Sequence, residues 1–262
     1  MRKILNKFFS KKVHIFYRHV HSSDQKNKKS RPDWFSFESC FLNLIDSLER
    51  DKSNLKFDLT VMFDGDDHSY QRDYMSDFMK NFNKKLDINL VIFKGGGAVQ
   101  SFEKTLEYIV SLNYGEKEWI YLLENDYLHN LDWTKKLDDL FASGVPFDYV
   151  SLYDHQDKYE FTPRFHESHQ GLKSVLYVAK THHWRTAPST CGSFILSAKT
   201  LKEDLNIIRD GGMDHQFFDL LIRDRGRTLL TPVPGLSTHV MLDLMSPTID
   251  WGGLSRFYSS QI

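Results

Sequence analysis

The segment Trp119-Ile120-Tyr121-Leu122-Leu123-Glu124-Asn125-Asp126 joins a short apolar run to an acidic tripeptide. An apolar run of this length predicts a buried strand, and in α/β folds ligands collect at the carboxyl ends of the strands. The two carboxylates delivered there suit Mg²⁺ or Mn²⁺, which leave open positions for diphosphate oxygens. A solvated loop after a core strand would explain the same residues. The neighbouring elements must therefore decide between these interpretations.

Hydrophobic periodicity on both sides of this segment alternates between strand and helix patterns. The spacing predicts strands over residues 13–20, 57–63, 88–93 and 147–153, and helices over 34–48, 74–82, 99–110 and 131–141. Asp33, which follows Pro32, is the expected N-cap of the first helix. This alternation predicts an α/β fold with a mostly parallel sheet flanked by helices.

The second part of the chain is less regular. Residues 155–190 are rich in His, Lys and aromatic side chains without a clear period, and residues 21–31 form a polar loop. Beyond them the pattern predicts strands over 191–197 and 228–230, and helices over 201–208 and 213–223. No internal repeat is visible. We expect a single compact domain over 1–262, with two halves at about 13–155 and about 156–262.

Composition and charge exclude several classes of protein. Hydrophobic residues make up 40% and charged residues 26% of the 262 residues, and the net charge of −1 predicts no general binding of nucleic acid. Cys40 and Cys191 lack metal-ligand spacing, which favours a reducing, cytoplasmic compartment. No apolar stretch or leader suggests membrane insertion. Residues 1–12 interleave basic and apolar side chains, as a solvated lead-in or a short helix in weak peripheral contact with the inner face of a membrane would.

Two segments are candidates for binding a nucleotide. Asp64 ends a predicted strand, where its carboxylate could accept hydrogen bonds from a ribose or a base, although Asp64-Gly65 is also a turn-forming pair. Gly95-Gly96-Gly97 precedes a predicted helix, and bare backbone N–H groups there could face an anion. A tight strand-to-helix turn would explain the glycines equally well. No Gly-Lys-Ser/Thr follows, so the segment is not a P-loop.

Three further positions could complete a site. Asp214 opens a predicted helix after Gly211-Gly212-Met213, where it is either an N-cap or a general base. His239 could offer an imidazole to the same cation as Asp126, or be an ordinary satisfied side chain. Trp184 and Arg185 could hold a sugar by stacking and a phosphate by charge, although a buried Trp beside a surface Arg explains them too.

Taken in order, these segments resemble the nucleotide-sugar glycosyltransferases of the GT-A fold, especially the family 2 group. Residues 57–65 resemble that family's strand ending in Asp-Gly-Ser, whose Asp binds the nucleoside. Gly95-Gly96-Gly97-Ala98 resembles its Gly/Ala-rich segment, and Glu124-Asn125-Asp126 takes the place of its Asp-x-Asp motif. Residues 192–196 resemble the strand after its acceptor loop. The similarity spans roughly residues 57 to 240.

The resemblance extends to the catalytic helix, with departures. Gly211-Gly212-Met213-Asp214 resembles the start of the Glu-Asp helix that supplies the family's base, and His239 falls where many members place a last metal ligand. Glu124 replaces the first Asp of the metal motif, Met213 replaces the Glu before the base, and residues 13–21 lack the usual Pro-x-Tyr-Asn ending. The chain thus resembles a divergent member.

The resemblance implies transfer of a sugar from a nucleotide-diphosphate sugar to a hydroxyl of a glycan, lipid-linked or other acceptor, with inversion expected from the family. The first half would bind the donor and the second the acceptor. Asp214 would be the catalytic base, Trp184 would contact the acceptor, and Asp126, His239 and Glu124 would hold Mn²⁺ or Mg²⁺. Donor contacts would come from Asp64, Gly95, Gly96, Gly97, Glu124, Asn125 and Arg185.

Two other functions fit the same residues. A metal-dependent nucleotidyltransferase or phosphoesterase could bind two ions through Asp126, Asp214 and His239, with His182 and His183 as further ligands. A catalytically silent glycan-binding protein could keep the same fold. Release of a nucleoside diphosphate from a sugar donor would separate glycosyl transfer from the first alternative, and binding of Mn²⁺ and nucleoside diphosphates would separate it from the second.

Overall fold

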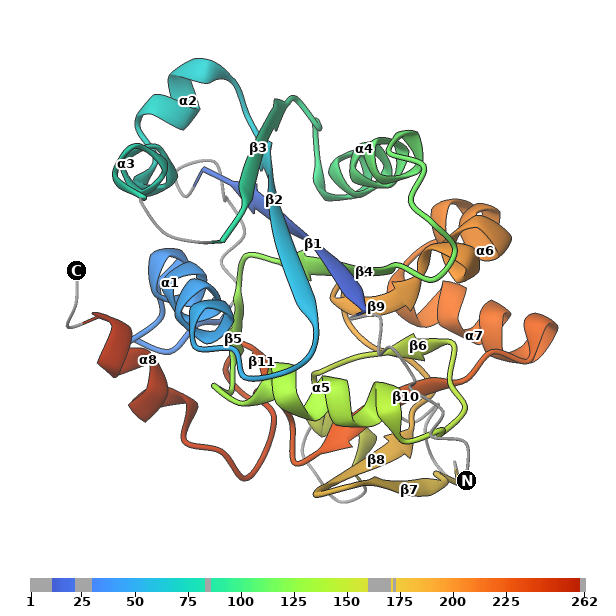
Figure 1. Cartoon of the computed structure of the whole chain (residues 1–262). Coiled ribbons are helices and arrows are strands. Elements are labelled where there is room, and N and C mark those ends of the chain that lie inside the picture. Colours follow the sequence, from blue (N-terminus) through green and yellow to red (C-terminus); the bar gives the residue numbers. More distant parts are fainter. Residues whose placement is uncertain (1–10, 22–29, 83–85, 160–170, 172, 260–262) are drawn as a thin grey trace, which may run out of the picture.

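A nine-stranded sheet in the order β3-β2-β1-β4-β9-β6-β10-β8-β7 forms the centre of the molecule (Figure 1). The computed structural model describes residues 11–21, 30–82, 86–159, 171 and 173–259. The strands are β1 (Lys12–Val20), β2 (Lys56–Asp64), β3 (Ile88–Phe93), β4 (Trp119–Glu124), β6 (Tyr149–Val150), β7 (Leu176–Ala179), β8 (His182–Thr186), β9 (Phe194–Ser197) and β10 (Leu229–Val233).

Most strands of this sheet run in one direction. β1 is parallel to β2 and β4, β2 is parallel to β3, and β6 is parallel to β10. Only β9 and β8 oppose both of their neighbours. The predicted mostly parallel sheet is therefore confirmed, and the carboxyl ends of β1, β2 and β4 share one edge, where ligands bind in such sheets.

Helices cover both faces of the sheet because successive side chains of a strand point to opposite faces. On β1, Ile15 and Tyr17 join the core under α1 and α5, whereas Phe16 joins the core under α4, α6 and α7 (Figure 1). The helices are α1 (Phe37–Glu49), α2 (Asp67–Gln71), α3 (Tyr74–Asn81), α4 (Ala98–Ser111), α5 (Trp133–Ala142), α6 (Ala198–Asp210), α7 (Asp214–Arg225) and α8 (Trp251–Ser259), with a short 3₁₀ turn, η2 (Gln156–Lys158).

A second, two-stranded sheet lies beside the end of β4. It pairs β5 (Tyr127–His129) with β11 (Ser237–His239) in antiparallel register, so that His239 lies opposite Tyr127. The side chain of Asn43 in α1 holds β5 through two hydrogen bonds. Its Nδ2 donates to the His129 carbonyl at 3.0 Å, and its Oδ1 accepts the His129 N–H at 2.6 Å. This small sheet brings the last part of the chain to the acidic segment after β4.

Several predictions at the level of elements need correction. Ser36, not Asp33, caps α1, because the Ser36 hydroxyl accepts the N–H of Ser39 at 2.9 Å. Only Tyr149 and Val150 of the expected strand over 147–153 pair in the sheet, and the strand expected over 191–197 begins at Phe194. The irregular stretch over 155–190 contains β7 and β8, which the sequence did not predict.

The predictions for the two polar segments near the start fall mainly outside the described residues. The membrane-contacting helix over 1–12 lies almost wholly in residues 1–10, and the loop over 21–31 lies mostly in residues 22–29. The cytoplasmic location and the membrane contact stay predictions. Across the described part of the chain, no helix has the length and apolar character needed to cross a bilayer.

Candidate functional site

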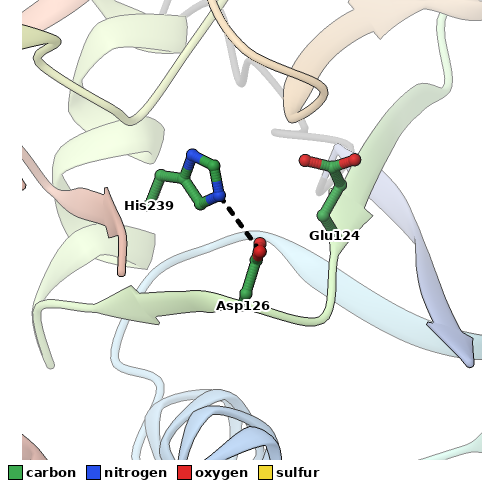
Figure 2. Close-up of side chains that lie close together, drawn as sticks. All are labelled: Glu124, Asp126 and His239. Carbon is green, nitrogen blue, oxygen red and sulfur yellow. Dashed lines mark hydrogen bonds and ion pairs between the residues drawn. The ribbon is translucent and has the colours of Figure 1, made fainter. Parts of the chain in front are cut away.

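Three side chains converge at the end of β4. Glu124 is the last residue of β4, Asp126 lies on the connection to β5, and His239 is the last residue of β11 (Figure 2). One ligand atom from each lies within 4.8 Å of the others, and no other group of three such residues occurs among the residues described. His239 Nε2 lies 3.0 Å from Asp126 Oδ2. The predicted metal ligands are thus brought together, although they are distant in sequence.

Backbone pairing between the two ends of the small sheet holds His239 in place. The Val240 N–H donates to the Asp126 carbonyl at 2.9 Å, which continues the β5–β11 register past His239. The imidazole stacks on the ring of Tyr127 with centroids 5.3 Å apart and an interplanar angle of 3°. Both Asp126 and His239 are buried, at 3% and 6% exposure. Backbone pairing, ring stacking and burial therefore hold the pair in place.

Glu124 completes the cluster because glycine at position 192 leaves room for it. A Cβ at Gly192 would lie 2.5 and 2.7 Å from the two carboxylate oxygens of Glu124. The Glu124 N–H donates to the Ser193 hydroxyl at 3.0 Å, which fixes the end of β4. Two carboxylates and one imidazole form a donor set that suits Mn²⁺ or Mg²⁺.

A cavity of about 880 Å³ opens on one side of the cluster. Asp64, at the end of β2, lines it and accepts the Gly95 N–H at 2.6 Å. Gly95 does not line the cavity. Its lack of a Cβ instead lets the Asp64 carboxylate approach its backbone. Gly96, whose φ of +93° favours glycine, and Gly97 face the cavity at the N-terminus of α4. This end of the cavity is a natural anion site.

Asn125, between the two carboxylates, lines the same cavity but is already engaged. Its side chain lies 3.1 Å from His19 Nδ1, and its carbonyl accepts the Tyr17 hydroxyl at 3.2 Å. His19 in turn lies 3.0 Å from Asp73, the N-cap of α3. Asn125 therefore anchors the acidic segment to β1, which gives it a positioning role in addition to the predicted donor contact.

A second cavity, of about 870 Å³, lies on the other side of the cluster and contains Asp214. Arg18, Ala98 and Glu124 line both cavities, so one member of the cluster, Glu124, stands where the two meet. Asp214 is the first residue of α7, and Met213 occupies the N-cap position. The Asp214 carboxylate instead accepts the Gly192 N–H at 2.5 Å. The interpretation of Asp214 as an N-cap is therefore wrong.

The protonation of Asp214 suits a general base. Burial, followed by the negative charge of Glu124, raises the pKa of Asp214 to about 6. A base works best when its pKa lies near the operating pH, because it is then both deprotonated and able to take a proton. Asp214 meets this condition and faces a cavity large enough for a substrate.

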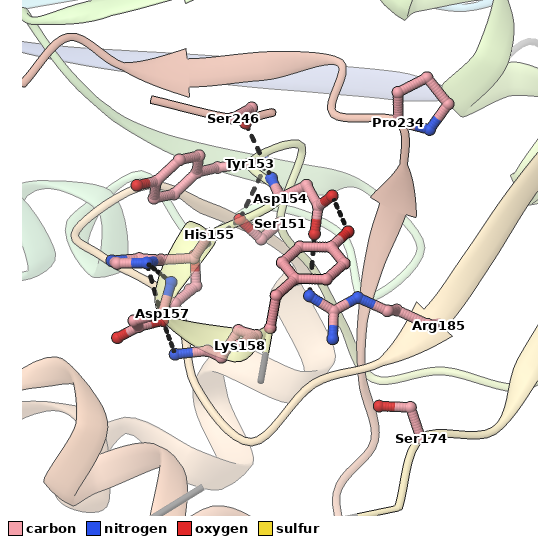
Figure 3. Close-up of polar contacts among 12 residues, drawn as sticks. Ser151, Tyr153, Asp154, His155, Asp157, Lys158, Ser174, Arg185, Pro234 and Ser246 are labelled. Atoms are coloured by element: carbon pink, nitrogen blue, oxygen red, sulfur yellow. Dashed lines mark hydrogen bonds and ion pairs between the residues drawn. The ribbon is translucent and has the colours of Figure 1, made fainter. Parts of the chain in front are cut away.

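Arg185 and Trp184 lie away from both cavities. Arg185 donates to Asp154 at 2.8 Å and stacks over the ring of Tyr159 at 4.9 Å, so a carboxylate already balances its charge (Figure 3). Trp184 has 0% exposure. The expectation that its ring stacks on a sugar needs correction, because strand β8 turns this side chain into the core. The alternative of a buried Trp is the one observed.

His182 and His183 do not join the metal cluster. His182 lies on β8 with its Nε2 atom 2.9 Å from the Pro234 carbonyl, and burial lowers its pKa. Neither histidine belongs to the group formed by Glu124, Asp126 and His239. The two-ion arrangement weighed for a phosphoesterase therefore lacks these ligands in the described part of the chain.

Sequence reasoning missed three basic residues around the site. Arg18 lines both cavities, Arg31 lines the first, and Lys158 lines the second. A signal existed for Arg18, since a charged side chain near the end of an otherwise apolar strand is uncommon in a buried sheet. No local signal existed for Arg31, whose contact with Asp126 spans 95 residues of sequence. Lys158 lies in the irregular stretch before β7.

Comparison with known proteins identifies the fold. No family model matches the sequence, and no curated protein matches it significantly. A crystal structure of GalNAc-T7 with UDP, GalNAc and Mn²⁺ is similar over 86% of this chain and 43% of that one, with 11% identity and a TM-score of 0.51. UDP-glucose pyrophosphorylase in complex with UDP-glucose aligns over 97% of this chain and 100% of that one, with 10% identity and a TM-score of 0.48.

The likeness to GalNAc-T7 is one of architecture. At 11% identity it shows the fold alone, and this chain spans less than half the length of that protein. The chain therefore has the GT-A fold, a mixed α/β domain with a large, mostly parallel sheet between helices. The cluster of Glu124, Asp126 and His239 lies at the carboxyl edge of that sheet.

Proposed function

We propose that the protein is a metal-dependent glycosyltransferase that moves a sugar from a nucleotide-diphosphate sugar to an acceptor hydroxyl. One observation carries the proposal: two cavities share Glu124 of the acidic cluster, and a carboxylate with a raised pKa stands in the second. A transferase needs this division, because donor and acceptor must reach one reacting carbon from different sides. The cluster provides the common boundary.

The first cavity is suited to the donor. Asp64 offers its carboxylate to a ribose or base, and the N-terminus of α4 at Gly96 and Gly97 offers partial positive charge to a diphosphate. Asp126, His239 and Glu124 would hold Mn²⁺ or Mg²⁺ at the junction with the second cavity. A divalent ion bound there supplies Lewis acidity that stabilises negative charge on the departing diphosphate.

The second cavity is suited to an acceptor hydroxyl. A sugar hydroxyl is a weak acid and needs a base to take its proton during attack, and Asp214 is placed to do so. A phosphate nucleophile is already ionised near neutral pH and needs no such base. The presence of Asp214 therefore favours glycosyl transfer over nucleotidyl transfer. The acceptor, whether glycan, lipid-linked or another hydroxyl compound, would contact residues near η2 and α7.

The proposal is tested by identifying which bond of a nucleotide-sugar the protein breaks. Nucleotide-sugars with different bases and sugars are incubated with the protein and Mn²⁺, and the products are separated by ion-exchange chromatography. Glycosyl transfer, or slow hydrolysis without acceptor, releases nucleoside diphosphate. Release of nucleoside monophosphate and sugar 1-phosphate would instead indicate a phosphoesterase, and formation of nucleoside triphosphate when pyrophosphate is added would indicate a nucleotidyltransferase. Absence of both products, with no calorimetric binding of nucleoside diphosphate, would identify a silent binding protein.

A further inference from the structure

Each carboxylate of the metal cluster is paired with an arginine. Arg31 Nη2 lies 2.5 Å from Asp126 Oδ2, and Arg18 Nη1 lies 3.6 Å from Glu124 Oε1. Among the described residues, the carboxylates of Glu124 and Asp126 are thus each offset by one arginine.

Arg31 is held firmly in this position. Its guanidinium lies over the ring of Phe35, 4.5 Å from the centroid, and donates a second hydrogen bond to the Val240 carbonyl. The side chain is 16% exposed and that of Asp126 is 4% exposed, so water screens the pair weakly. Arg31 also lines the donor cavity, where its charge faces the space assigned to the diphosphate.

Arg18 is anchored independently. Its guanidinium lies over Phe102 at 5.1 Å from the centroid, and Nη2 lies 3.5 Å from the Ala98 carbonyl at the start of α4. The Arg18 contact with Glu124 is longer than the Arg31 contact with Asp126. Arg31 is therefore the arginine that competes most directly for a metal ligand.

The pairing has a consequence for binding. A divalent cation at Asp126 and His239 would add two positive charges beside two arginines and would compete with Arg31 for the Asp126 carboxylate. The phosphates of a nucleoside diphosphate carry several negative charges and would offset the added positive charge. Binding of the cation alone is therefore opposed, whereas binding of the two together is balanced.

We propose that Arg31 couples the binding of the cation to that of the donor diphosphate. In the free protein it occupies Asp126 and weakens cation binding, and when both ligands are present its guanidinium pairs with the diphosphate. This inference rests on the proposed function, because it assumes that a diphosphate occupies the first cavity. Coupling of this kind is reciprocal, so the cation must strengthen diphosphate binding by the same factor.

Calorimetry on Arg31→Gln tests the coupling. MnCl₂ is titrated into wild type and variant, and uridine and guanosine diphosphates are then titrated with and without saturating Mn²⁺. We expect Arg31→Gln to bind Mn²⁺ alone more tightly, on the order of tenfold, because a charge-assisted pair no longer competes. With Mn²⁺ present, the variant should bind the diphosphate more weakly by a similar factor.

Arg72→Gln is the matched control. Arg72 lines the same cavity, and its described hydrogen bond is to the His68 carbonyl rather than to the cluster. The Arg72→Gln substitution removes the same charge as Arg31→Gln but leaves the contacts of Asp126 unchanged. The affinity for Mn²⁺ alone should therefore change less than twofold. Arg31→Lys, which keeps the charge but loses the planar fork, should fall between wild type and Arg31→Gln and also serves if the latter misfolds.

Four outcomes overturn the inference. Unchanged or weaker Mn²⁺ binding in Arg31→Gln would show that Arg31 does not compete for Asp126. An equal effect of Arg72→Gln would show general electrostatics instead of a specific pair. Absence of Mn²⁺ binding in both wild type and Arg31→Gln would remove the premise. If Mn²⁺ binds but no diphosphate does, both the glycosyltransferase proposal and the coupling fail. The Mn²⁺ titrations alone would still show whether Arg31 and Mn²⁺ compete for Asp126.

Discussion

Replacing Asp214 by asparagine should make the protein more stable and nearly inactive at the same time. The Asn side chain has the size of Asp, and its amide oxygen can still accept the Gly192 N–H that Asp214 accepts at 2.5 Å. The substitution removes the negative charge beside Glu124 and the ability to take a proton. A residue kept for packing alone would not combine these two effects, since active sites hold charges at a cost in stability.

The size of the stability gain follows from the pKa. Burial and then the charge of Glu124 raise the pKa of Asp214 from 3.8 to about 6 in the folded protein. The folded state therefore holds this proton more tightly than the unfolded chain, and stability is lost as pH rises from about 4 through about 6. At higher pH the ionised carboxylate costs the folded state about 3 kcal/mol at most, because each tenfold change in acidity corresponds to about 1.4 kcal/mol.

Thermal and chemical unfolding at several pH values, without metal, measure the effect. Asp214→Asn should unfold at a temperature higher by roughly 5 °C near pH 8, and the difference should vanish below about pH 3, where wild-type Asp214 is mostly protonated in both states. Transfer by the variant should fall by roughly 10² to 10⁴ while nucleoside diphosphate binding persists. In the wild type, kcat/KM should fall as the pH drops through about 6, because Asp214 becomes protonated. The residual activity of Asp214→Asn should lack this fall. Near wild-type transfer, or a pH-independent stability difference, would refute the reasoning.

Four further substitutions separate the roles of the remaining site residues. Asp126→Ala should lower kcat by a factor on the order of 10² with the fold intact, and full activity in the folded variant would contradict its role as a ligand. His239→Ala should weaken Mn²⁺ binding by about 10 to 100-fold, and an unchanged Mn²⁺ titration would contradict that role. Asp64→Ala should raise the donor KM far more than it lowers kcat, because a ribose contact is made equally in ground and transition states; a loss in kcat alone would exclude that contact. Gly192→Ala should weaken Mn²⁺ binding without removing a ligand, because the new Cβ would collide with the Glu124 carboxylate. An unchanged affinity for Mn²⁺ would show that Glu124 is not a ligand.

Local patterns predicted the parallel part of the fold well. β3 spans Ile88–Phe93 as predicted, and α4 and β4 lie within a residue of their expected bounds, because period and caps are local properties of the sequence. The acidic segment after β4 could be placed at the carboxyl edge of the sheet for the same reason. That Glu124, Asp126 and His239 lie together agrees with prediction, whereas metal binding by them stays a prediction.

Non-local pairings were beyond the reach of those patterns. β5 and β11 are three residues each, too short to show a period, and they exist because they pair with each other across the chain. β7 and β8 likewise extend the sheet beyond β10 by tertiary pairing. Burial of Trp184 depends on these strands, so the sequence alone could not decide between a core ring and an exposed one.

The cluster of Glu124, Asp126 and His239 is divided between two sheets, which explains why local sequence patterns alone do not define its geometry. Glu124 is fixed by β4 of the large sheet, whereas Asp126 and His239 are fixed by the register of β5 with β11. A cation bound to all three would tie the small sheet to the large one at the point where the two cavities meet. In the free protein Arg31 bonds to Asp126 and to the Val240 carbonyl just after β11, so it joins the two sides of the small sheet at the carboxylate that the metal would use. Exchange of Arg31 for the cation at Asp126 is therefore what would link cation binding to the donor.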